Sequence, residues 1–468
     1  MKILFYFMLF LIPLSGYPCT IGIIRADLTQ SGKPIIWKTR DRDSGFGINY
    51  PVYDDVGLYP FTGFNDSVNL NSTWGGINTV GFGIANSLAS DLAGTSSTFN
   101  GALIRVALRN YESLNEFEEY LDATNQTGRN TKGNFAAFDR FGNGAMYEIA
   151  NNEWYKFDLS DAENGFIVRT NFSFNGEPNP ESGRYIRSNT IINELIENNI
   201  FDVKNLIDMH FRDFSDFEGN PFDIPYQGST NGYYGYINNR YSICRHTSIG
   251  SFILEGIDED NTIPIMWTLA GFPGVTPVIP YIPYEFYIDQ ERIPNLALSL
   301  KSNLMNINSY LINTIHFLHP DNQGIWDKIR PFETNVIYDF QEIYSSADFL
   351  GYYQGWLVST ESMAFDLMST IVGSTDITLP PIPKNIIATF PNPNTHSFYI
   401  KSDYVFKSEY TIEVYNIKGQ LLHNVTHDKE KKLSDNAIYL DENLPSGIYL
   451  IRVMDSENTF TTKTLRLK

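Results

Sequence analysis

The sequence predicts an α+β protein with a larger mixed domain followed by a small β-sandwich. Segments with strand-like alternation mix with segments of helical spacing but do not alternate strictly, which favours layered α+β packing over a doubly wound parallel sheet. A Pro-rich stretch begins at residue 375, and short strands with turns follow it. We therefore expect a domain over 19–374, a linker over 375–384 and a second domain over 385–468.

The first 18 residues have the organisation of a secretory signal. Lys2 precedes an unbroken apolar run from Ile3 to Leu14, and a Ser-Gly pair follows it. This run is too short to span a bilayer as a helix. We expect an exported protein that loses residues 1–18 and does not insert stably into a membrane.

The first domain begins with strands. Residues 19–40 alternate apolar and polar residues around Gly32, which predicts two strands joined by a hairpin. Glycines in 75–87 predict a turn and a further strand. Residues 97–124 have helical spacing, and a Ser-x-x-Glu capping box inside this range marks a helix start.

Strands and helices then follow one another to the end of the domain. The pattern predicts strands around a Gly-rich turn in 133–158 and a short apolar strand in 165–173. Helical spacing returns after Pro180, strand-like sequence returns near residue 242, and a long helical stretch ends the domain. These later segments cover 183–199, 203–214, 242–256 and 343–373.

Composition excludes several classes of partner. With 34 basic against 54 acidic residues, the net charge is −20, and such a surface repels nucleic acid and anionic lipid. The seven histidines show no metal-ligand spacing, so we expect no metal and no cofactor.

The chain has two cysteines, Cys19 and Cys244. A disulfide between them and a lipid anchor on Cys19 are two alternatives, although Tyr17-Pro18 fits a lipoprotein signal poorly. We favour a third interpretation, in which processing exposes Cys19 as the first residue of the mature protein. An N-terminal cysteine carries its own nucleophile and base, since its α-amine has a pKa of about 7.7–8.0.

The segments Cys-Thr-Ile-Gly-Ile (19–23) and Trp-Lys-Thr-Arg-Asp-Arg-Asp-Ser (37–44) resemble the opening of the N-terminal-nucleophile hydrolases. This group includes choloylglycine hydrolases, penicillin V acylases and isopenicillin N acyltransferases. The resemblance implies a four-layer αββα fold and identifies Asp41 with the family's catalytic aspartate. Thr39 replaces the family's Asn, and Asp43 competes with Asp41 for the acidic role; a turn aspartate at 41 and a surface arginine at 40 are the structural alternatives.

Three later motifs extend the resemblance. Gly-Ile-Asn-Thr-Val-Gly (76–81) and the strand after it imply that Asn86 contributes to the oxyanion hole. Residues 165–173 resemble the family's Thr-Asn strand end, which implies that Asn171 donates to the tetrahedral oxyanion. Residues 182–188 resemble the family's helix start, which implies that Arg184 is the arginine that lowers the pKa of the cysteine.

Two further segments complete the analysis. Cys244 and His246 lie close in sequence, and we interpret them as buried or semi-buried structural side chains rather than as a catalytic pair. Residues 385–468 resemble the C-terminal sorting domain of type IX secretion substrates through FPNPNTHSF, EVYNIKGQ and LPSGIYLIRV. That resemblance implies passage through the periplasm and then release or display at the cell surface, with the type IX machinery as partner.

Together these resemblances imply a secreted amide hydrolase or acyltransferase that acts on a small acyl amide through a Cys19 thioester. A cysteine-nucleophile dipeptidase of the same fold is one alternative, and a non-catalytic cell-surface binding protein is another.

Maturation raises a problem of its own, because a signal cut after Gly16 leaves Tyr17-Pro18 ahead of Cys19. Removal by an X-Pro dipeptidyl peptidase and autocatalytic cleavage by Cys19 are both open. We favour the peptidase because Pro18 restricts the backbone.

Overall fold

The computed structural model describes most of residues 19–373 and 387–466. Within these ranges the structure does not describe residues 43–47, 68–70, 95–96, 177–181, 216–235, 259–262, 287, 307–310, 319–322, 391–396, 403–405, 407, 417–419, 429–437, 440, 442 and 457–458. The predictions for residues 1–18, Asp43 and the 375–384 linker therefore fall outside the described residues. The chain divides into two compact units, Met1–Ser374 and Thr375–Lys468.

A six-stranded antiparallel sheet begins with the predicted hairpin. In the first two strands Thr20 lies opposite Thr39, and Gly22 lies opposite Trp37. A Cβ on Gly22 would meet the Trp37 ring at 2.1 Å, so only glycine lets the indole lie flat across this strand. In sheet order the strands are β10 (Phe166–Arg169), β1 (Thr20–Ile24), β2 (Ile35–Asp41), β12 (Ser248–Glu255), β13 (Ile265–Ala270) and β14 (Ile279–Tyr281).

A seven-stranded sheet follows chain order, each strand pairing antiparallel with the next. The strands predicted in 75–87 and 133–158 are confirmed. Gly81, with a φ of 88°, forms the turn predicted in 75–87. The strands are β3 (Asn49–Asp54), β4 (Phe61–Asp66), β5 (Thr73–Asn78), β6 (Gly83–Leu88), β7 (Gly133–Phe138), β8 (Gly144–Ile149) and β9 (Trp154–Asp158). A small third sheet joins β11 (Tyr236–Asn238), β16 (Leu311–Asn313) and β15 (Met305–Asn306).

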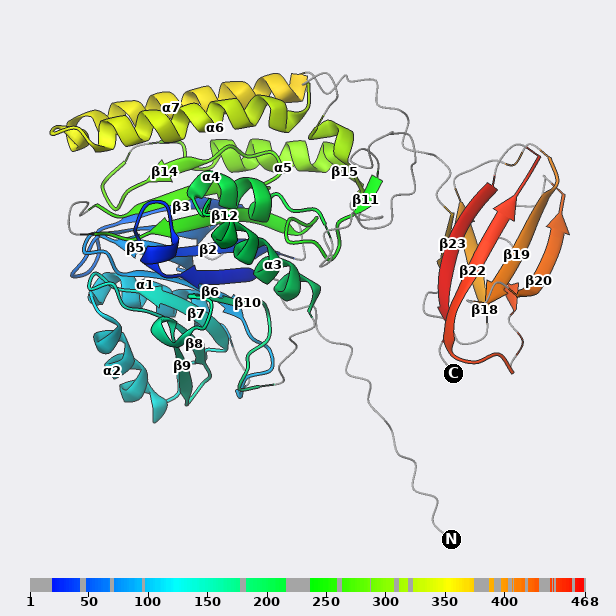
Figure 1. Ribbon diagram of the computed structural model, residues 1–468, viewed down its shortest axis with the longest axis horizontal. Helices are drawn as coiled ribbons and strands as arrows, with labels where there is room; N and C mark the ends of the chain where they lie inside the picture. The colour runs from blue at the N-terminus through cyan, green and yellow to red at the C-terminus, as the bar shows by residue number, and fades with distance from the viewer. Residues whose placement is uncertain are drawn as a thin grey trace, which may run out of the picture. The chain divides into compact units, whose positions relative to one another are not determined.

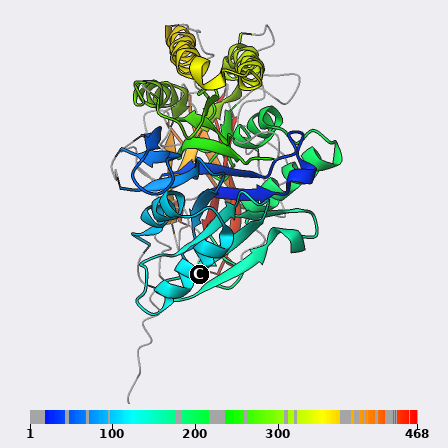
Figure 2. The same ribbon diagram turned by 90° about the vertical axis from the view of Figure 1, so that its left-hand side faces the viewer.

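Helices cover the outer face of each sheet (Figures 1 and 2). α1 (Asn100–Asn110) and α2 (Leu114–Asn125) cover the seven-stranded sheet, and the predicted Ser113–Glu116 capping box begins α2. In the described part of the chain, no helix is both long enough and apolar enough to cross a bilayer. On the six-stranded sheet lie α3 (Gly183–Glu197), α4 (Val203–Leu206) with a π-helix (Ile207–Phe211), α5 (Arg292–Leu304), α6 (Ile325–Tyr344) and α7 (Phe349–Gly373).

The two sheets stack face to face between these helices, which confirms the four-layer αββα prediction. Ile21 of β1 is fully buried in one core with Ala85, Ala136 and Met146 of the other sheet. Some expected boundaries were wrong. Strand β12 begins at Ser248 rather than near residue 242, because 242–247 form turns. The helical stretch expected over 343–373 is α7, and the sequence analysis missed both α5 and α6.

The second unit is entirely β in its described residues and has its own apolar core, as predicted for a small sandwich. Its two antiparallel sheets are β17 (Ile387–Phe390), β18 (Ser397–Ser402), β21 (Ile438–Tyr439) and β20 (Leu421–His427), β19 (Tyr410–Asn416), β22 (Gly447–Met454), β23 (Thr459–Arg466).

Candidate active site

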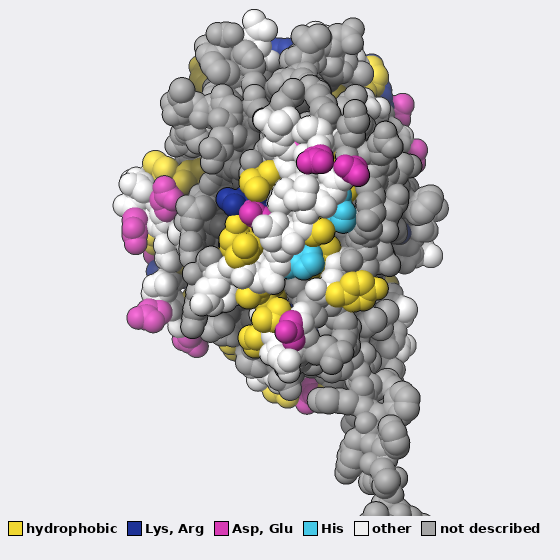
Figure 3. All heavy atoms as spheres, turned by 90° about the vertical axis from the view of Figure 1, so that its right-hand side faces the viewer, with side chains coloured by type: hydrophobic (Ala, Val, Ile, Leu, Met, Phe, Trp, Pro, Cys, Tyr) yellow, Lys and Arg dark blue, Asp and Glu magenta, His cyan; other side chains and the backbone are white. Residues whose placement is uncertain are grey.

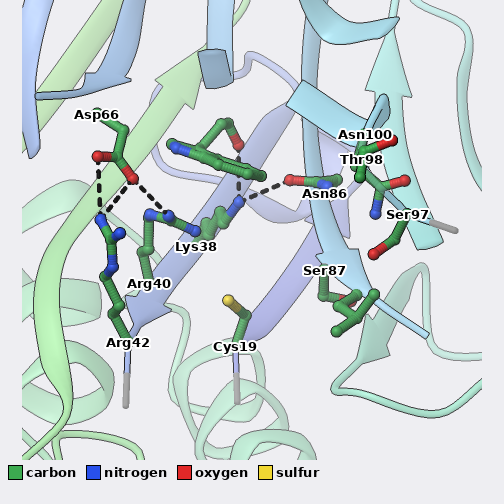
Figure 4. Close-up of a pocket in the computed structure, with 12 residues that line it drawn as sticks. Cys19, Lys38, Arg40, Arg42, Asp66, Asn86, Ser87, Ser97, Thr98 and Asn100 are labelled. Atoms are coloured by element: carbon green, nitrogen blue, oxygen red, sulfur yellow. Dashed lines mark hydrogen bonds and ion pairs between the residues drawn. The ribbon is translucent and has the colours of Figure 1, made fainter. Parts of the chain in front are cut away.

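Cys19 lies immediately before β1 and faces a cavity between the two sheets (Figure 4). Side chains alternate along a strand, and the Thr20–Thr39 pair places Cys19 beside Arg40, on the face shared with Lys38. Cys19 is 3% exposed, and the cavity has a volume of about 290 Å³. Its lining comprises Cys19, Lys38, Arg40, Arg42, Asp66, Trp74, Asn86, Ser87, Leu88, Ser97, Thr98 and Asn100.

One side chain from the turn after β10 and one from α3 hold the backbone of Cys19. Its N–H donates to Asn171 Oδ1 at 2.8 Å. Arg184 donates to the Cys19 carbonyl at 2.5 Å, to Thr20 Oγ1 at 3.0 Å and to Asn171 Oδ1 at 2.9 Å. Two of the residues identified from sequence motifs thus meet at the main chain of Cys19.

The turn that carries Asn171 is itself firmly held. Asn134 Nδ2 donates to the carbonyls of Thr170 and Phe172, at 3.3 and 3.0 Å, and Ser87 Oγ donates to the Thr170 carbonyl at 2.5 Å. Asn171 Nδ2 donates to the Leu88 carbonyl at 2.9 Å. An oxyanion contact from this amide would therefore replace or share the bond to Leu88.

Asp41 lies on the opposite face of β2 from Lys38 and Arg40, towards the helices. It is fully buried, and its Oδ1 accepts from Ser248 Oγ at 2.5 Å. Its Oδ2 has no hydrogen-bond partner among the described residues. Burial raises the pKa of Asp41 to about 6, although Arg245, Arg184, the Ser248 bond and Lys301 lower it.

Lys38 is a candidate residue that the motif analysis missed. Its Nζ donates to the Trp74 carbonyl at 2.7 Å and to Asn86 Oδ1 at 2.9 Å. Burial lowers the pKa of Lys38 to about 7, the charge of Cys19 raises it, and Arg40 lowers it further. The sequence did contain a signal for Lys38. Side chains two residues apart on a strand point to the same face of the sheet, so Lys38 and Arg40 share a face.

Asn86 lies in the cavity on β6, as its motif implied (Figure 4). The bond from Lys38 fixes its Oδ1 as an acceptor, so its Nδ2 is the donor that remains for another group.

Arg40 is 5% exposed and stacks 3.9 Å above the Trp74 ring, so the surface-charge alternative for Arg40 is wrong.

Cys244 lies apart from this chemistry. Both cysteines are free thiols, so the disulfide alternative is wrong. Cys244 is fully buried, and burial, followed by the charge of Asp41, raises the pKa of its thiol far above the ordinary value. Burial, followed by Arg245, lowers the pKa of the half-buried His246 to about 3. A neutral thiol and a neutral imidazole fit the structural interpretation of this pair.

Among the residues that the structure describes, no cluster of three or more His, Cys, Asp or Glu side chains has the arrangement of a metal site. The polar groups around Cys19 instead come from amide, guanidinium, ammonium and carboxyl side chains.

Comparison with known proteins gives no match to any curated sequence. Among solved structures, the chain is similar to a Caenorhabditis elegans ortholog of N-acylethanolamine-hydrolyzing acid amidase, at 15% identity over 50% of this chain and 92% of that one, with a TM-score of 0.33. It is also similar to a variant of the Clostridium perfringens conjugated bile acid hydrolase (10% identity, 56% and 92%, TM-score 0.34). A third is Agrobacterium tumefaciens penicillin V acylase (12% identity, 60% and 88%, TM-score 0.34).

The second unit has a sequence match of its own. Residues 388–466 match the family described as the secretion system C-terminal sorting domain. This match covers nearly all of the described strands of the unit. It confirms the sorting domain expected from the sequence, and it indicates that this chain is exported.

Proposed function

We propose that the first unit is an amide hydrolase or acyltransferase whose nucleophile is the thiol of Cys19 after removal of residues 1–18. The observation that carries the proposal is the setting of the Cys19 nitrogen. A side chain, Asn171 Oδ1, accepts its hydrogen bond, and Arg184 braces both Asn171 and the Cys19 carbonyl. A nitrogen held in this way has the fixed position that a terminal amine needs to act as a base.

The unpartnered oxygen of Asp41 supports the same assignment. A buried acceptor without a donor costs free energy, so its retention calls for an explanation. A mature α-ammonium has three N–H donors, and Asn171 accepts from one of them. We assign Asp41 the role of orienting this amine and balancing its charge.

The reaction then proceeds by acyl transfer. The α-amine takes the thiol proton, the thiolate attacks the amide carbonyl, and the tetrahedral oxyanion forms. Asn86 Nδ2 is available to donate to that oxygen, and Asn171 Nδ2 joins it by exchanging its bond to Leu88. The α-ammonium returns the proton to the departing amine, which leaves a thioester on Cys19. Water or another amine then takes the acyl group.

The positive charges of Arg184 and Lys38 favour the Cys19 thiolate during the reaction. Burial, followed by Arg245, lowers the pKa of Arg184 to about 10, so Arg184 is protonated at neutral pH. Lys38 is largely protonated below pH 7. Cations close to a thiol stabilise its ionised form.

The proposal for the second unit is that residues 385–468 direct export through the type IX machinery, after which the protein is secreted or displayed. The sorting-domain match supports this route. Removal of Tyr17-Pro18 by a dipeptidyl peptidase or by autocatalysis would complete the nucleophile.

A substrate screen with matched variants tests the proposal. The mature protein should hydrolyse some member of a panel of N-acyl amides, Cys19→Ala should abolish turnover, and Cys244→Ala should retain it. Alkylation should label Cys19 and block activity. The dipeptidase alternative predicts turnover of dipeptides only. A retained upstream peptide together with no turnover in the panel would favour the non-catalytic binding protein.

A further inference from the structure

The cavity beside Cys19 has a charge opposite to that of the protein as a whole. The chain has a net charge of −20, yet among the described residues the cavity lining contains the three cations Lys38, Arg40 and Arg42 and a single carboxylate, Asp66. Figure 4 shows both arginines directed at this single carboxylate. A cavity between low-dielectric walls strengthens such an excess of positive charge.

The hydrogen bonds show which donors remain. Arg42 binds both oxygens of Asp66 through Nη1, at 3.0 and 2.9 Å, and in the described part of the chain its Nε and Nη2 donate to no residue. Arg40 donates from Nε to Asn49 at 2.9 Å and from Nη2 to Asp66 at 3.1 Å, which leaves Nη1 without a described acceptor. Within the described residues, Asp66 is therefore the one carboxylate that binds both guanidinium groups, and N–H donors remain on each of them.

The arginines are also rigid and close to the reacting atoms. Arg40 is 5% exposed, is stacked on Trp74, and lies beside Cys19 in the strand pair. The side chain of Arg42 is 14% exposed, so solutes reach it more readily. Planar guanidinium groups can bind carboxylates through paired N–H donors. Each arginine binds Asp66 through one nitrogen, Nη2 of Arg40 and Nη1 of Arg42.

We infer that this cavity selects acyl amides that carry a carboxylate near the scissile bond, with the carboxylate bound by Arg42 and Arg40. The inference rests on the proposed function and names its substrate class. Both arginines flank Asp41 in the segment that resembles the family, but the resemblance assigns a catalytic role to Asp41 and to neither arginine.

The test compares substrates that differ only in charge. N-acylglycine and the corresponding N-acylglycinamide place the carboxylate in the amine half, whereas a succinyl amide and its neutral succinamide place it in the acyl half. The mature protein should prefer the anionic member of at least one pair by at least ~10-fold in kcat/KM. Arg42→Gln should remove most of this preference through KM, and Arg140→Gln, an exposed arginine paired with Glu112, should leave it intact.

A binding measurement separates this inference from the proposed function. N-acetylglycine should protect Cys19 from alkylation at a concentration at least ~10-fold lower than N-acetylglycinamide requires, whether or not turnover occurs. Protection without turnover would overturn the amidase proposal but support the anion site. Equal kcat/KM within both pairs together with equal protection by the two ligands, or equal protection where no turnover is found, would overturn the anion site.

Discussion

Ser248 offers a sharp test of the role assigned to Asp41. Ser248 Oγ donates a 2.5 Å hydrogen bond to Asp41 Oδ1, and among the described residues Oδ2 of the same carboxyl has no partner. Replacing Ser248 with alanine leaves the buried carboxylate without this donor. The charges of Arg245, Arg184 and Lys301 remain, so the change isolates the hydrogen bond.

The magnitude follows from the strength of this bond. A hydrogen bond to a charged group contributes about 1.5–3 kcal/mol, and 1.36 kcal/mol corresponds to one pH unit. The pKa of Asp41 is already raised to about 6 by burial, and losing the donor raises it further. If the carboxylate is the working form, activity is lost as pH falls through this pKa. The acidic limb of the pH–rate profile should therefore move upward by about 1–2 pH units.

The Ser248→Ala substitution should also lower the free energy of unfolding, and it should do so more at high pH than at low pH. Since the folded pKa lies above the usual 3.8, ionised Asp41 destabilises the fold above about pH 6, and this cost disappears as pH falls towards 3.8. Ser248→Ala should lower the free energy of unfolding by about 1.5–3 kcal/mol at pH 8 and by about 1 kcal/mol at pH 5. Denaturant titration at the two pH values measures this difference.

Ser251→Ala is the matched control, because Ser251 lies on the same strand and donates only to the neutral Thr39 hydroxyl, at 3.3 Å. It should leave the pH–rate profile in place. Identical profiles for the wild type and Ser248→Ala, together with equal stability losses at pH 5 and pH 8, would refute the role of Ser248. An equal shift in Ser251→Ala would show that the effect is not specific to Asp41.

Three other predictions follow from the site and from the second unit. Asn171→Ala should lower kcat by ~10²-fold or more with a smaller change in KM, measured by steady-state kinetics; an effect confined to KM would contradict a transition-state contact. Lys38→Met should cost most below pH 7, where the lysine is charged, and its effect should fade as pH rises; a pH-independent loss would contradict the charge role. Deletion of 385–468 should leave the purified enzyme folded and active but retained in the periplasm of its host, because these residues belong to a separate compact unit; lost activity in vitro would mean that they contribute to the site.

Local patterns predicted much of the architecture. Alternation around Gly32 identified the first hairpin, and the Ser113–Glu116 pair identified the start of α2, because both signals depend on neighbouring residues. The composition change at 375 coincides with the division between the two compact units. The sequence analysis missed α5, although Ile293, Ala297, Leu300 and Leu304 of its buried face have the spacing of an amphipathic helix.

The candidate site was also predicted in part from the sequence. Motifs identified Cys19, Asn171 and Arg184, and their hydrogen bonds bring all three together. Asn86 shares the cavity with Cys19, whereas Asp41 lies on the other face of β2 from the thiol. The roles proposed for these residues in catalysis stay predictions.

The sequence by itself determined where most strands and helices lie along the chain and the export signature of the second unit, and it supplied the candidates for the nucleophile and its partners. Only the tertiary structure decided which charges surround them. Lys38 reaches Asn86 because one sheet stacks on the other, and Ser248 reaches Asp41 across 207 residues of chain because β12 pairs with β2. Periodicity along a chain specifies which face a side chain occupies, but it does not specify which distant strand lies opposite that face.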